Sequence, residues 1–165
     1  MSNLVVISLG GNKGDWKFIF ESGLNELSKL GKLDKVSSIY KTEPWGVKEQ
    51  PWFKNQIVGL RTELTPVAMM KELLKIEAAH GRNRENEERW GERSLDLDIL
   101  LFNDIVVDEK ELSVPHPRMH ERRFILIPLV EIYPHMRHPI LHKFMNELLD
   151  DCLDETEIIK LENAV

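Results

Sequence analysis

Two aspartates near the middle of the chain, Asp96 and Asp98, alternate with large aliphatic residues over positions 95–100. Side chains of an extended strand alternate between its two faces, so the aliphatic residues would face a core while both carboxylates project from the opposite side. Carboxylates two strand positions apart are separated by roughly 6.5–7 Å along the backbone, and they can converge on one or two hard cations. Magnesium suits such a pair because it prefers oxygen ligands and shares its coordination shell with water and substrate phosphates.

An arginine-rich segment leads directly into the two aspartates, and its cations are Arg82, Arg84, Arg89 and Arg93. The planar guanidinium group matches phosphate oxygens in bidentate geometry, so this segment indicates a phosphate ligand beside the metal. Two simpler interpretations remain open: the aspartates could be the solvated face of an antiparallel sheet, and the arginines could pair with glutamates of the same segment. The continuous run into an apolar strand favours the phosphate site, because two like charges on one face repel unless a cation neutralises them.

Length and composition limit the possible functions. A chain of 165 residues, 42% hydrophobic and 30% charged, is long enough for one compact domain, so we expect a single domain over residues 1–165. The formal net charge of −6 argues against a general nucleic-acid binder, which normally carries a basic face. The single cysteine, Cys152, excludes an internal disulfide. The sequence has no charged leader with a cleavage site and no apolar run of about 18 residues, so we expect a cytoplasmic protein without a membrane segment.

Periodicity and capping signals predict the elements that must position these residues. We expect strands at 4–9, 33–41, 53–63 and 95–102, and helices at 16–30, 66–80, 124–132 and 141–149. Asp15 and Thr65 are the expected helix caps, Gly31 the expected end of the first helix, and Asn103-Asp104 the expected turn of a hairpin from the last strand to 105–107. The order strand, helix, strand, strand, helix, strand predicts an α+β fold with a ferredoxin-like antiparallel sheet and flanking helices, in three α/β/α layers.

The run from Arg89 to Leu100 resembles the signature of the 6-hydroxymethyl-7,8-dihydropterin pyrophosphokinase family. Further blocks resemble the same family in the same order, at residues 9–12, 38–46, 50–55, 76–82, 114–117 and 122–124, so that the likeness spans about residues 4–135. The resemblance implies an ATP-dependent diphosphotransferase of tetrahydrofolate biosynthesis. It would transfer pyrophosphate from ATP to the hydroxyl of 6-hydroxymethyl-7,8-dihydropterin, giving the pterin diphosphate and AMP.

The resemblance also implies which residues act. Asp96 and Asp98 would hold two magnesium ions that prepare ATP for in-line attack on the β-phosphorus, with Arg82 and Arg93 as the other catalytic residues. The pterin would lie between the rings of Phe53 and Phe124, and the positions that match the pterin pocket are Thr42, Glu43, Trp45, Phe53, Asn55 and Phe124. The positions that match the ATP site are Leu74, Glu77, Arg84, Trp90, Arg93, Ile99, Ser113, His116 and Arg122.

The chain departs from the family pattern at two positions near the nucleotide: Glu111 stands where family members carry an arginine, and Pro117 replaces an aromatic residue. Two other functions remain as alternatives. One is another metal-dependent nucleotidyl or phosphoryl transferase, because paired carboxylates on a strand serve several such reactions. The other is a non-catalytic ferredoxin-like module that binds a ligand or RNA, which leaves the two aspartates unexplained. We expect a monomer whose partners are the small molecules ATP and hydroxymethyldihydropterin, without nucleic acid or membrane.

Overall fold

The computed structural model describes residues 2–44, 49–81 and 94–161 of the chain. The strands are β1 (Asn3–Gly11), β2 (Lys32–Val36), β3 (Tyr40–Thr42), β4 (Phe53–Thr62), β5 (Asp96–Phe102), β6 (Val107–Asp108), β7 (Ser113–Val114) and β8 (Ile158–Lys160). The helices are α1 (Trp16–Ser28), α2 (Pro66–Ala79), the 3-10 turn η1 (Met119–Glu121), α3 (Arg123–Ile132) and α4 (Met145–Asp151). None of these helices combines the length and the apolar composition that a bilayer crossing requires.

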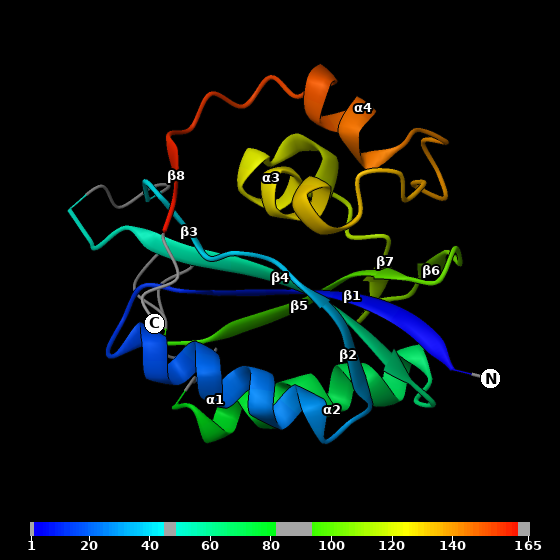
Figure 1. Ribbon diagram of the computed structural model, residues 1–165. Helices are drawn as coiled ribbons and strands as arrows, with labels where there is room; N and C mark the ends of the chain where they lie inside the picture. Colours follow the sequence, from blue (N-terminus) through cyan, green and yellow to red (C-terminus); the bar gives the residue numbers. More distant parts are fainter. Residues whose placement is uncertain (1, 45–48, 82–93, 162–165) are drawn as a thin grey trace.

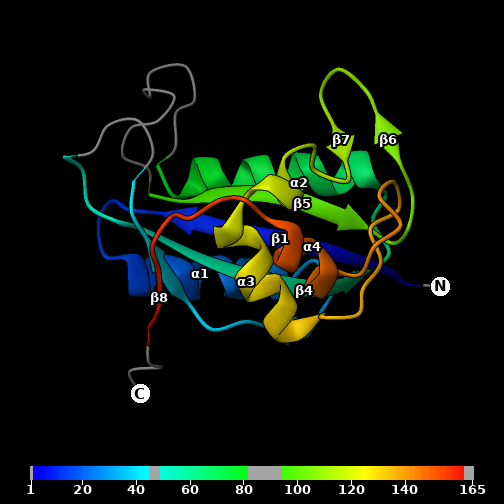
Figure 2. The same cartoon turned by 90° about the horizontal axis from the view of Figure 1, so that it is seen from above.

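The main sheet has the order β5-β1-β4-β3-β8, with β2 beside β4, and every pairing between these strands is antiparallel. Helices α1 and α2 cover one face of the sheet, and α3 and α4 cover the other (Figure 1). Seen from above, α3 and α4 lie across the strands, and the small β6–β7 pair projects from the rim (Figure 2). The predicted α+β class, with an antiparallel sheet in three layers, is confirmed.

Both faces of the inner strand β1 and of the edge strand β5 are buried, which explains the long apolar runs of these two strands. Val5, Ile7 and Leu9 pack with side chains of α1 and α2, whereas Val6 and Leu101 pack with those of α3 and α4. Full burial of each such side chain stabilises the fold by roughly 1.5–3 kcal/mol. Strands β1 and β5 are therefore held rigidly from both sides, which fixes the backbone that carries the two aspartates.

The predicted helix starts are confirmed in atomic detail. The Asp15 carboxylate accepts a hydrogen bond from Phe18 N at 3.4 Å, and Thr65 Oγ1 accepts one from Ala68 N at 3.3 Å. The helical spacing of α2 predicts a buried face made of Val67, Met70, Leu73, Leu74 and Ile76. In the structure this face is shifted: the buried residues are Met69, Leu73, Ile76 and Glu77, while Val67 and Leu74 are 38% and 45% exposed. The shift leaves Leu74 at the surface beside β5, where it can meet a ligand.

The predicted strand 33–41 is broken into β2 and β3 at Ser37. Ser37 N donates to Ile57 O, but Ile57 N donates to the side-chain oxygen of Ser37, both at 2.9 Å. The hydroxyl thus replaces the backbone carbonyl as acceptor, and that carbonyl accepts from Gln56 Nε2 at 2.9 Å. The ladder with β4 is interrupted here and resumes at Tyr40, which gives the short strand β3 its own direction.

The predicted hairpin after β5 is wrong. Strand β5 ends at Phe102, and the next residue, Asn103, has a left-handed φ of 50°. The side-chain oxygen of Asn103 accepts a hydrogen bond from Leu4 N at 2.8 Å, and Asn103 N donates to Leu4 O. The asparagine therefore bonds to the start of β1 instead of turning the chain back along β5. Strand β6 pairs with β7, through Val107 with Val114.

The helix predicted at 141–149 begins four residues later, at Met145, because His138 organises the preceding turn. The His138 side chain is buried, and its Nδ1 accepts hydrogen bonds from Ile140 N at 3.2 Å and Leu141 N at 3.1 Å. These two backbone groups are consequently bonded to a side chain and not to a helix. Strand β8 was not predicted at all, although the helix at 124–132 is confirmed as α3 with one additional residue at its start.

This turn predicts acid sensitivity. Burial, with the nearby His120 and His142, lowers the pKa of His138 from 6.5 to about 4. The unfolded chain takes up a proton on this ring at higher pH than the folded chain, so the free energy of unfolding falls as pH drops from 6.5 towards 4. We expect a loss of about 2 kcal/mol between pH 7 and pH 5 from this group. In urea titrations at both pH values, His138→Asn, which keeps an acceptor but cannot be protonated, should show a smaller loss than the wild type. Equal losses would contradict the prediction, and the exposed His135→Asn is the control.

Candidate active site

A row of paired residues crosses three strands on the α3 and α4 side of the sheet. Asp96 of β5 pairs with Gly10 of β1, and Gly10 pairs with Asn55 of β4. Directly paired residues of an antiparallel sheet point to the same face, so the amide of Asn55 and the carboxylate of Asp96 project from one surface. Neighbouring strands lie about 4.8 Å apart, which places the Asp96 and Asn55 backbones about 10 Å apart.

The same face carries most of the other predicted residues of the sheet. Asp98 lies two positions after Asp96, and Phe53 lies two positions before Asn55. Thr42 of β3 pairs with Phe53. The register therefore brings the predicted metal carboxylates and the predicted pterin residues of the sheet onto one surface, a result that sequence spacing alone did not show.

Asn55 is held in one orientation. Its Nδ2 donates to Thr42 Oγ1 at 3.1 Å, and both side chains are buried. Its Oδ1 lies over Gly10, where a Cβ atom would stand 3.3 Å from that oxygen. The absence of a side chain at Gly10 therefore provides space for the Asn55 amide. Thr42 and Gly10 together fix the orientation of this amide before any ligand binds.

Glu77 supports the strand of the two aspartates. It is only 2% exposed, and its Oε2 accepts a hydrogen bond at 2.7 Å from the backbone nitrogen of Leu97, the residue between Asp96 and Asp98. The sequence predicted that Glu77 contacts ATP. In the structure its carboxylate is directed at β5, so it acts on the position of the aspartates, and the ATP contact stays a prediction.

Removing this acceptor should therefore damage both stability and activity. Glu77→Leu leaves a buried backbone N–H without its acceptor, and we expect the free energy of unfolding to fall by roughly 1–3 kcal/mol and kcat to fall about tenfold or more. Glu77→Gln keeps an oxygen acceptor and should lose clearly less in both quantities. Urea unfolding and initial rates at saturating substrates measure the two effects. Equal losses in both variants would show that the bond to Leu97 is not what matters.

A bulge in β5 anchors His116 next to the aspartates. In the register between β1 and β5, Val6 pairs with Leu101 and Ile7 with Ile99, so Leu100 is the extra residue. The carbonyl of Leu100 accepts a hydrogen bond from His116 N at 2.9 Å. The irregularity in the strand is thus the feature that attaches the segment after β7 to the edge of the sheet.

The His116 ring is neutral and offers a donor. Burial, together with the positive charge of Arg122, lowers the pKa of His116 from 6.5 to about 4. Its Nδ1 accepts from Arg118 N at 3.2 Å, so the proton of the neutral ring is on Nε2. Burial also lowers the pKa of Arg122, whereas Asp98 and, more weakly, Asp96 raise it. The positive charge of Arg122 therefore interacts with both aspartates.

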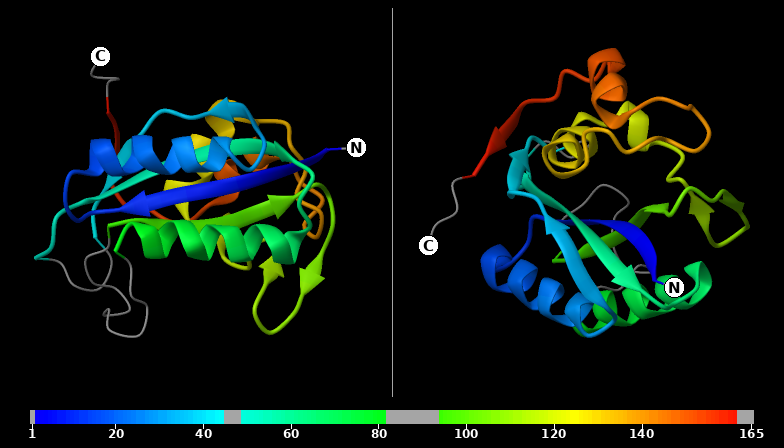
Figure 3. Two further views of the ribbon diagram at one scale, coloured as in Figure 1. Left: turned by 90° about the horizontal axis from the view of Figure 1, so that it is seen from below. Right: turned by 45° about the vertical axis from the view of Figure 1, so that its right-hand side comes forward.

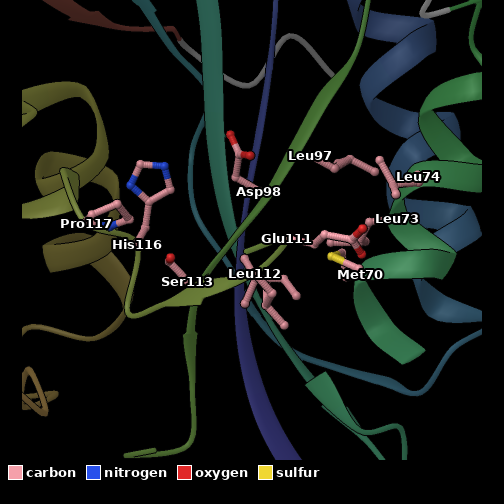
Figure 4. Close-up of a pocket in the computed structure, with 11 residues that line it drawn as sticks. Met70, Leu73, Leu74, Leu97, Asp98, Glu111, Leu112, Ser113, His116 and Pro117 are labelled. Atoms are coloured by element: carbon pink, nitrogen blue, oxygen red, sulfur yellow. The ribbon is translucent and has the colours of Figure 1, made fainter. Parts of the chain in front are cut away.

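A cavity of about 570 Å³ opens along β5, the last strand at this end of the sheet order. Asp98, Ser113 and His116 line one side of it, and Leu74, Leu97 and Met70 line the other (Figure 4). The full lining is Met70, Leu73, Leu74, Leu97, Asp98, Ile99, Glu111, Leu112, Ser113, His116 and Pro117. One apolar wall and one polar wall suit a ligand with a flat base at one end and charged oxygens at the other.

Four of the residues predicted to bind ATP line this cavity, namely Leu74, Ile99, Ser113 and His116, and so do both positions of departure, Glu111 and Pro117. Sequence reasoning missed Met70 and Leu73 as lining residues, because their helical spacing assigned them to the core. Trp45, Arg82, Arg84, Trp90 and Arg93 lie outside the described residues.

Phe124 is the second residue of α3, which covers the same face of the sheet. Its ring packs against the α3 and α4 core and lies 5.7 Å from the guanidinium carbon of Arg122. Phe53 and Phe124 are both half-buried, and α3 contacts β4, the strand of Phe53. The two rings therefore come from opposite sides, the sheet and the helix layer. Glu43 also has a defined partner, since its Oε1 accepts from Glu157 N at 3.2 Å.

Two hydrogen-bonded pairs near the site were not predicted. Asn12 Nδ2 donates to Gln50 Oε1 and to Pro51 O, both at 2.9 Å, which ties the turn after β1 to the segment before β4. Tyr40 OH donates to Glu131 Oε1 at 2.7 Å, and burial together with this carboxylate raises the pKa of Tyr40. The only signal for Asn12 and Gln50 was that each stands inside a block that resembles the family.

The donor set fits magnesium better than zinc. Among residues 2–44, 49–81 and 94–161, no group of three or more histidine, cysteine, aspartate or glutamate side chains could hold a metal ion. Zinc sites generally need three or four such ligands from the protein. Magnesium is commonly bound by one or two carboxylates with water and substrate phosphates completing its shell, which is what Asp96 and Asp98 offer.

Comparisons with known proteins agree with this geometry. Residues 6–134 match the model of a family described as 7,8-dihydro-6-hydroxymethylpterin-pyrophosphokinase (HPPK). The chain is 43% identical to the 2-amino-4-hydroxy-6-hydroxymethyldihydropteridine pyrophosphokinase of Bacillus subtilis, over 80% of this chain and 79% of that protein. It is 37% identical to the protein of the same name from Pseudomonas aeruginosa, over 92% of this chain and 93% of that protein.

A solved structure shows the same fold. The crystal structure of wild-type Plasmodium falciparum HPPK-DHPS matches with a TM-score of 0.73 at 18% identity, over 92% of this chain and 45% of that chain. This chain thus spans less than half of that longer protein. The chain belongs to the 7,8-dihydro-6-hydroxymethylpterin-pyrophosphokinase family, whose members are ATP-dependent diphosphotransferases of folate biosynthesis.

Proposed function

We propose that the chain transfers pyrophosphate from ATP to the hydroxyl of 6-hydroxymethyl-7,8-dihydropterin, giving the pterin diphosphate and AMP as a step of tetrahydrofolate biosynthesis. The observation that supports this most strongly is the row of paired residues from Asp96 through Gly10 to Asn55. A phosphate chain at the carboxylates and a flat ring at the amide would lie side by side on one face. Such placement is the larger part of catalysis where the protein itself does little covalent chemistry.

At the pterin end, the ring would lie between Phe53 on the sheet and Phe124 on α3, because aromatic faces bind flat heteroaromatic rings well. The oriented amide of Asn55, fixed by Thr42, would meet the polar edge of the ring. Glu43 and Trp45 would complete this side, together with backbone groups of the same segment. Pre-set orientation of the amide supports this assignment, since binding then costs little ordering of the side chain.

At the ATP end, the base would contact the apolar wall of the cavity at Leu74 and Ile99. Ser113, the Nε2–H of His116 and the guanidinium of Arg122 would contact the phosphates, and Glu77 would support β5 from behind. Arg84 and Trp90 are proposed to add nucleotide contacts. Arg82 and Arg93 are proposed to stabilise the charge on the transferring phosphates.

Asp96 and Asp98 would hold two magnesium ions. When bound, magnesium neutralises phosphate charge and aligns ATP for in-line attack by the pterin hydroxyl on the β-phosphorus, with AMP as the leaving group. The two carboxylates would hold these ions on the same face as Asn55, where Arg122 adds a positive charge beside them. Tight ATP binding should therefore require magnesium.

The deciding experiment mixes the chain with ATP, magnesium and 6-hydroxymethyl-7,8-dihydropterin and identifies the nucleotide product by chromatography. AMP that forms only when the pterin is present is the expected result. ADP would indicate ordinary phosphoryl transfer, and pyrophosphate would indicate nucleotidyl transfer, so either would contradict the proposal. An unchanged ATP pool would indicate a binding module without catalysis.

We further propose a monomer of one domain that acts in the cytoplasm on small molecules and without nucleic acid. A single sheet carries both hydrophobic layers, which supports one domain. Light scattering should give a mass near 19.3 kDa, and a mass twice as large would contradict the monomer. Cell fractionation should recover the chain with cytoplasmic enzymes.

A further inference from the structure

The segment after α4 bonds to the sheet wall of the proposed pterin pocket. It forms strand β8, which lies beside β3 with Thr42 paired to Ile158 (Figure 3). Glu43 and Glu157 bond reciprocally: Glu43 N donates to Glu157 O at 3.4 Å, and Glu157 N donates to Glu43 Oε1 at 3.2 Å. Thr42 and Glu43, two of the residues that we assign to the pterin pocket, are therefore paired or bonded to this C-terminal segment.

The same segment bonds to the helix wall of the pocket. Asp154 Oδ2 accepts from Arg123 N at 3.0 Å, and Arg123 Nη1 donates to Thr156 O at 3.1 Å. Arg123 is the first residue of α3 and directly precedes Phe124. Asp154 Oδ1 also accepts from the backbone and the hydroxyl of Thr156, which closes a tight turn between the two attachments.

Charge strengthens this attachment. Burial would raise the pKa of Asp154, but hydrogen bonds from Thr156 and Arg123 and the charge of Arg123 outweigh it and lower that pKa. Asp154 is therefore ionised near neutral pH, and hydrogen bonds to an ionised acceptor are the stronger kind.

We propose that residues 154–160, the C-terminal strap, fix the separation between the two walls of the pterin pocket, with Asp154, Thr156 and Glu157 as positioning residues. Through seven consecutive residues the strap joins Thr42 and Glu43 to Arg123 of α3, the residue directly before Phe124. It rests on the proposed function, because the pterin must lie between these walls. Residues 154–160 lie outside residues 6–134, the part of the chain that matches the family model.

The physical reason is the geometry of stacking. A flat ring gains from two aromatic faces only when both stand at contact distance, so a pocket whose walls can separate binds it weakly. Strand β3 has three residues, and it is held by β4 on one side and by β8 on the other. Loss of the strap would free the wall that carries Thr42 while leaving β5 and the ATP cavity intact.

The test compares three variants with the wild type. Asp154→Ala removes the acceptor for Arg123 N, Arg123→Met removes the donor to Thr156 O, and Glu157→Pro removes the N–H that donates to Glu43. We expect Asp154→Ala and Glu157→Pro to raise KM and the dissociation constant for the pterin about tenfold, with the ATP dissociation constant unchanged within about twofold. Arg123→Met should show a smaller change of the same kind. Glu155→Ala is the matched control, because Glu155 is exposed within the same segment.

The possible outcomes distinguish the proposed role of the strap from the proposed function. If the wild type forms AMP with the pterin and the variants bind pterin as tightly as the wild type does, the proposed role of the strap is wrong and the proposed function stands. If the wild type forms no AMP, the proposed function is contradicted. The role of the strap is then still tested by comparing the pterin affinity of the variants with that of the wild type by fluorescence. Equal weakening of ATP and pterin binding would mean a general structural role and would also overturn it. Should Asp154→Ala fail to fold, Arg123→Met decides, since it leaves every backbone bond in place.

Discussion

Replacing Asp98 by asparagine is expected to lower kcat/KM about a thousandfold while the chain remains folded. The substitution keeps the size of the side chain and removes one of the two negative charges that we propose to hold magnesium. It also removes the strongest attraction on the guanidinium of Arg122. Because Asp98 lines the ATP cavity and faces the same side as Asn55, the loss falls on the transferring phosphates and not on the pterin.

The measurement is AMP formation at saturating pterin, with ATP and magnesium varied in turn, accompanied by a thermal melt of each variant. Asp104→Asn is the matched control, because it removes the same charge from an exposed position just after β5. We expect the control to keep full activity and the two melts to agree closely. An Asp98→Asn variant within tenfold of the wild type would overturn the assignment of the metal site.

The parts of the fold that the sequence predicted are those that local chemistry decides. The starts of α1 and α2 depend on one side-chain oxygen at Asp15 and at Thr65, three residues before the N–H that each accepts. The alternation in β5 is visible in its own residues, and the two aspartates project together as expected. Such features need no knowledge of what lies across the sheet.

The parts that were wrong or missed depend on contacts between distant residues. Ser37 interrupts its strand because Ile57, twenty positions later, donates to its hydroxyl. Strand β5 ends before Asn103 because the side chain of Asn103 accepts a hydrogen bond from Leu4 N, 99 positions earlier in the sequence. Strand β8 forms because β3 offers it an edge to pair with, and its three residues are too short a run to be predicted as a strand from the sequence. Propensity and spacing carry no information on these pairings.

The candidate site divides in the same way. Residue type and period predicted a metal site at Asp96 and Asp98, and that site stays a prediction. The relation of those carboxylates to Asn55 depends on the register of two strand pairings, and it became evident only when β1 was placed between them. Arg123 lies in the block 122–124 that resembles the family, but Asp154 lies outside every such block, so the attachment of the C-terminal strap to the pocket could be found only in the structure.

Gly31 was predicted to end the first helix, but α1 ends at Ser28, and the described glycines with a positive φ are Gly14 and Gly81. Gly31 is required for a different reason: a Cβ atom there would stand 2.0 Å from Arg61 O and 3.2 Å from Thr62 Cα, both backbone atoms of β4. No side chain can rotate away to relieve such a contact, so the turn between α1 and β2 would have to move off the sheet.

Gly31→Ala is therefore expected to lower the free energy of unfolding by about 3 kcal/mol or more, measured by urea titration. Gly23→Ala is the matched control, because the same methyl group inside α1 would meet Leu9 and Leu95 side chains at an ordinary contact distance of 3.5 Å. Alanine is the better helix former, so the control should be neutral or stabilising by up to about 1 kcal/mol. Opposite signs for the same substitution at Gly31 and Gly23 would show that backbone proximity, and not loss of glycine flexibility, sets the effect. A loss below about 1 kcal/mol for Gly31→Ala would mean that the turn can shift, and the edge that carries β2 is then less rigid than its contacts indicate.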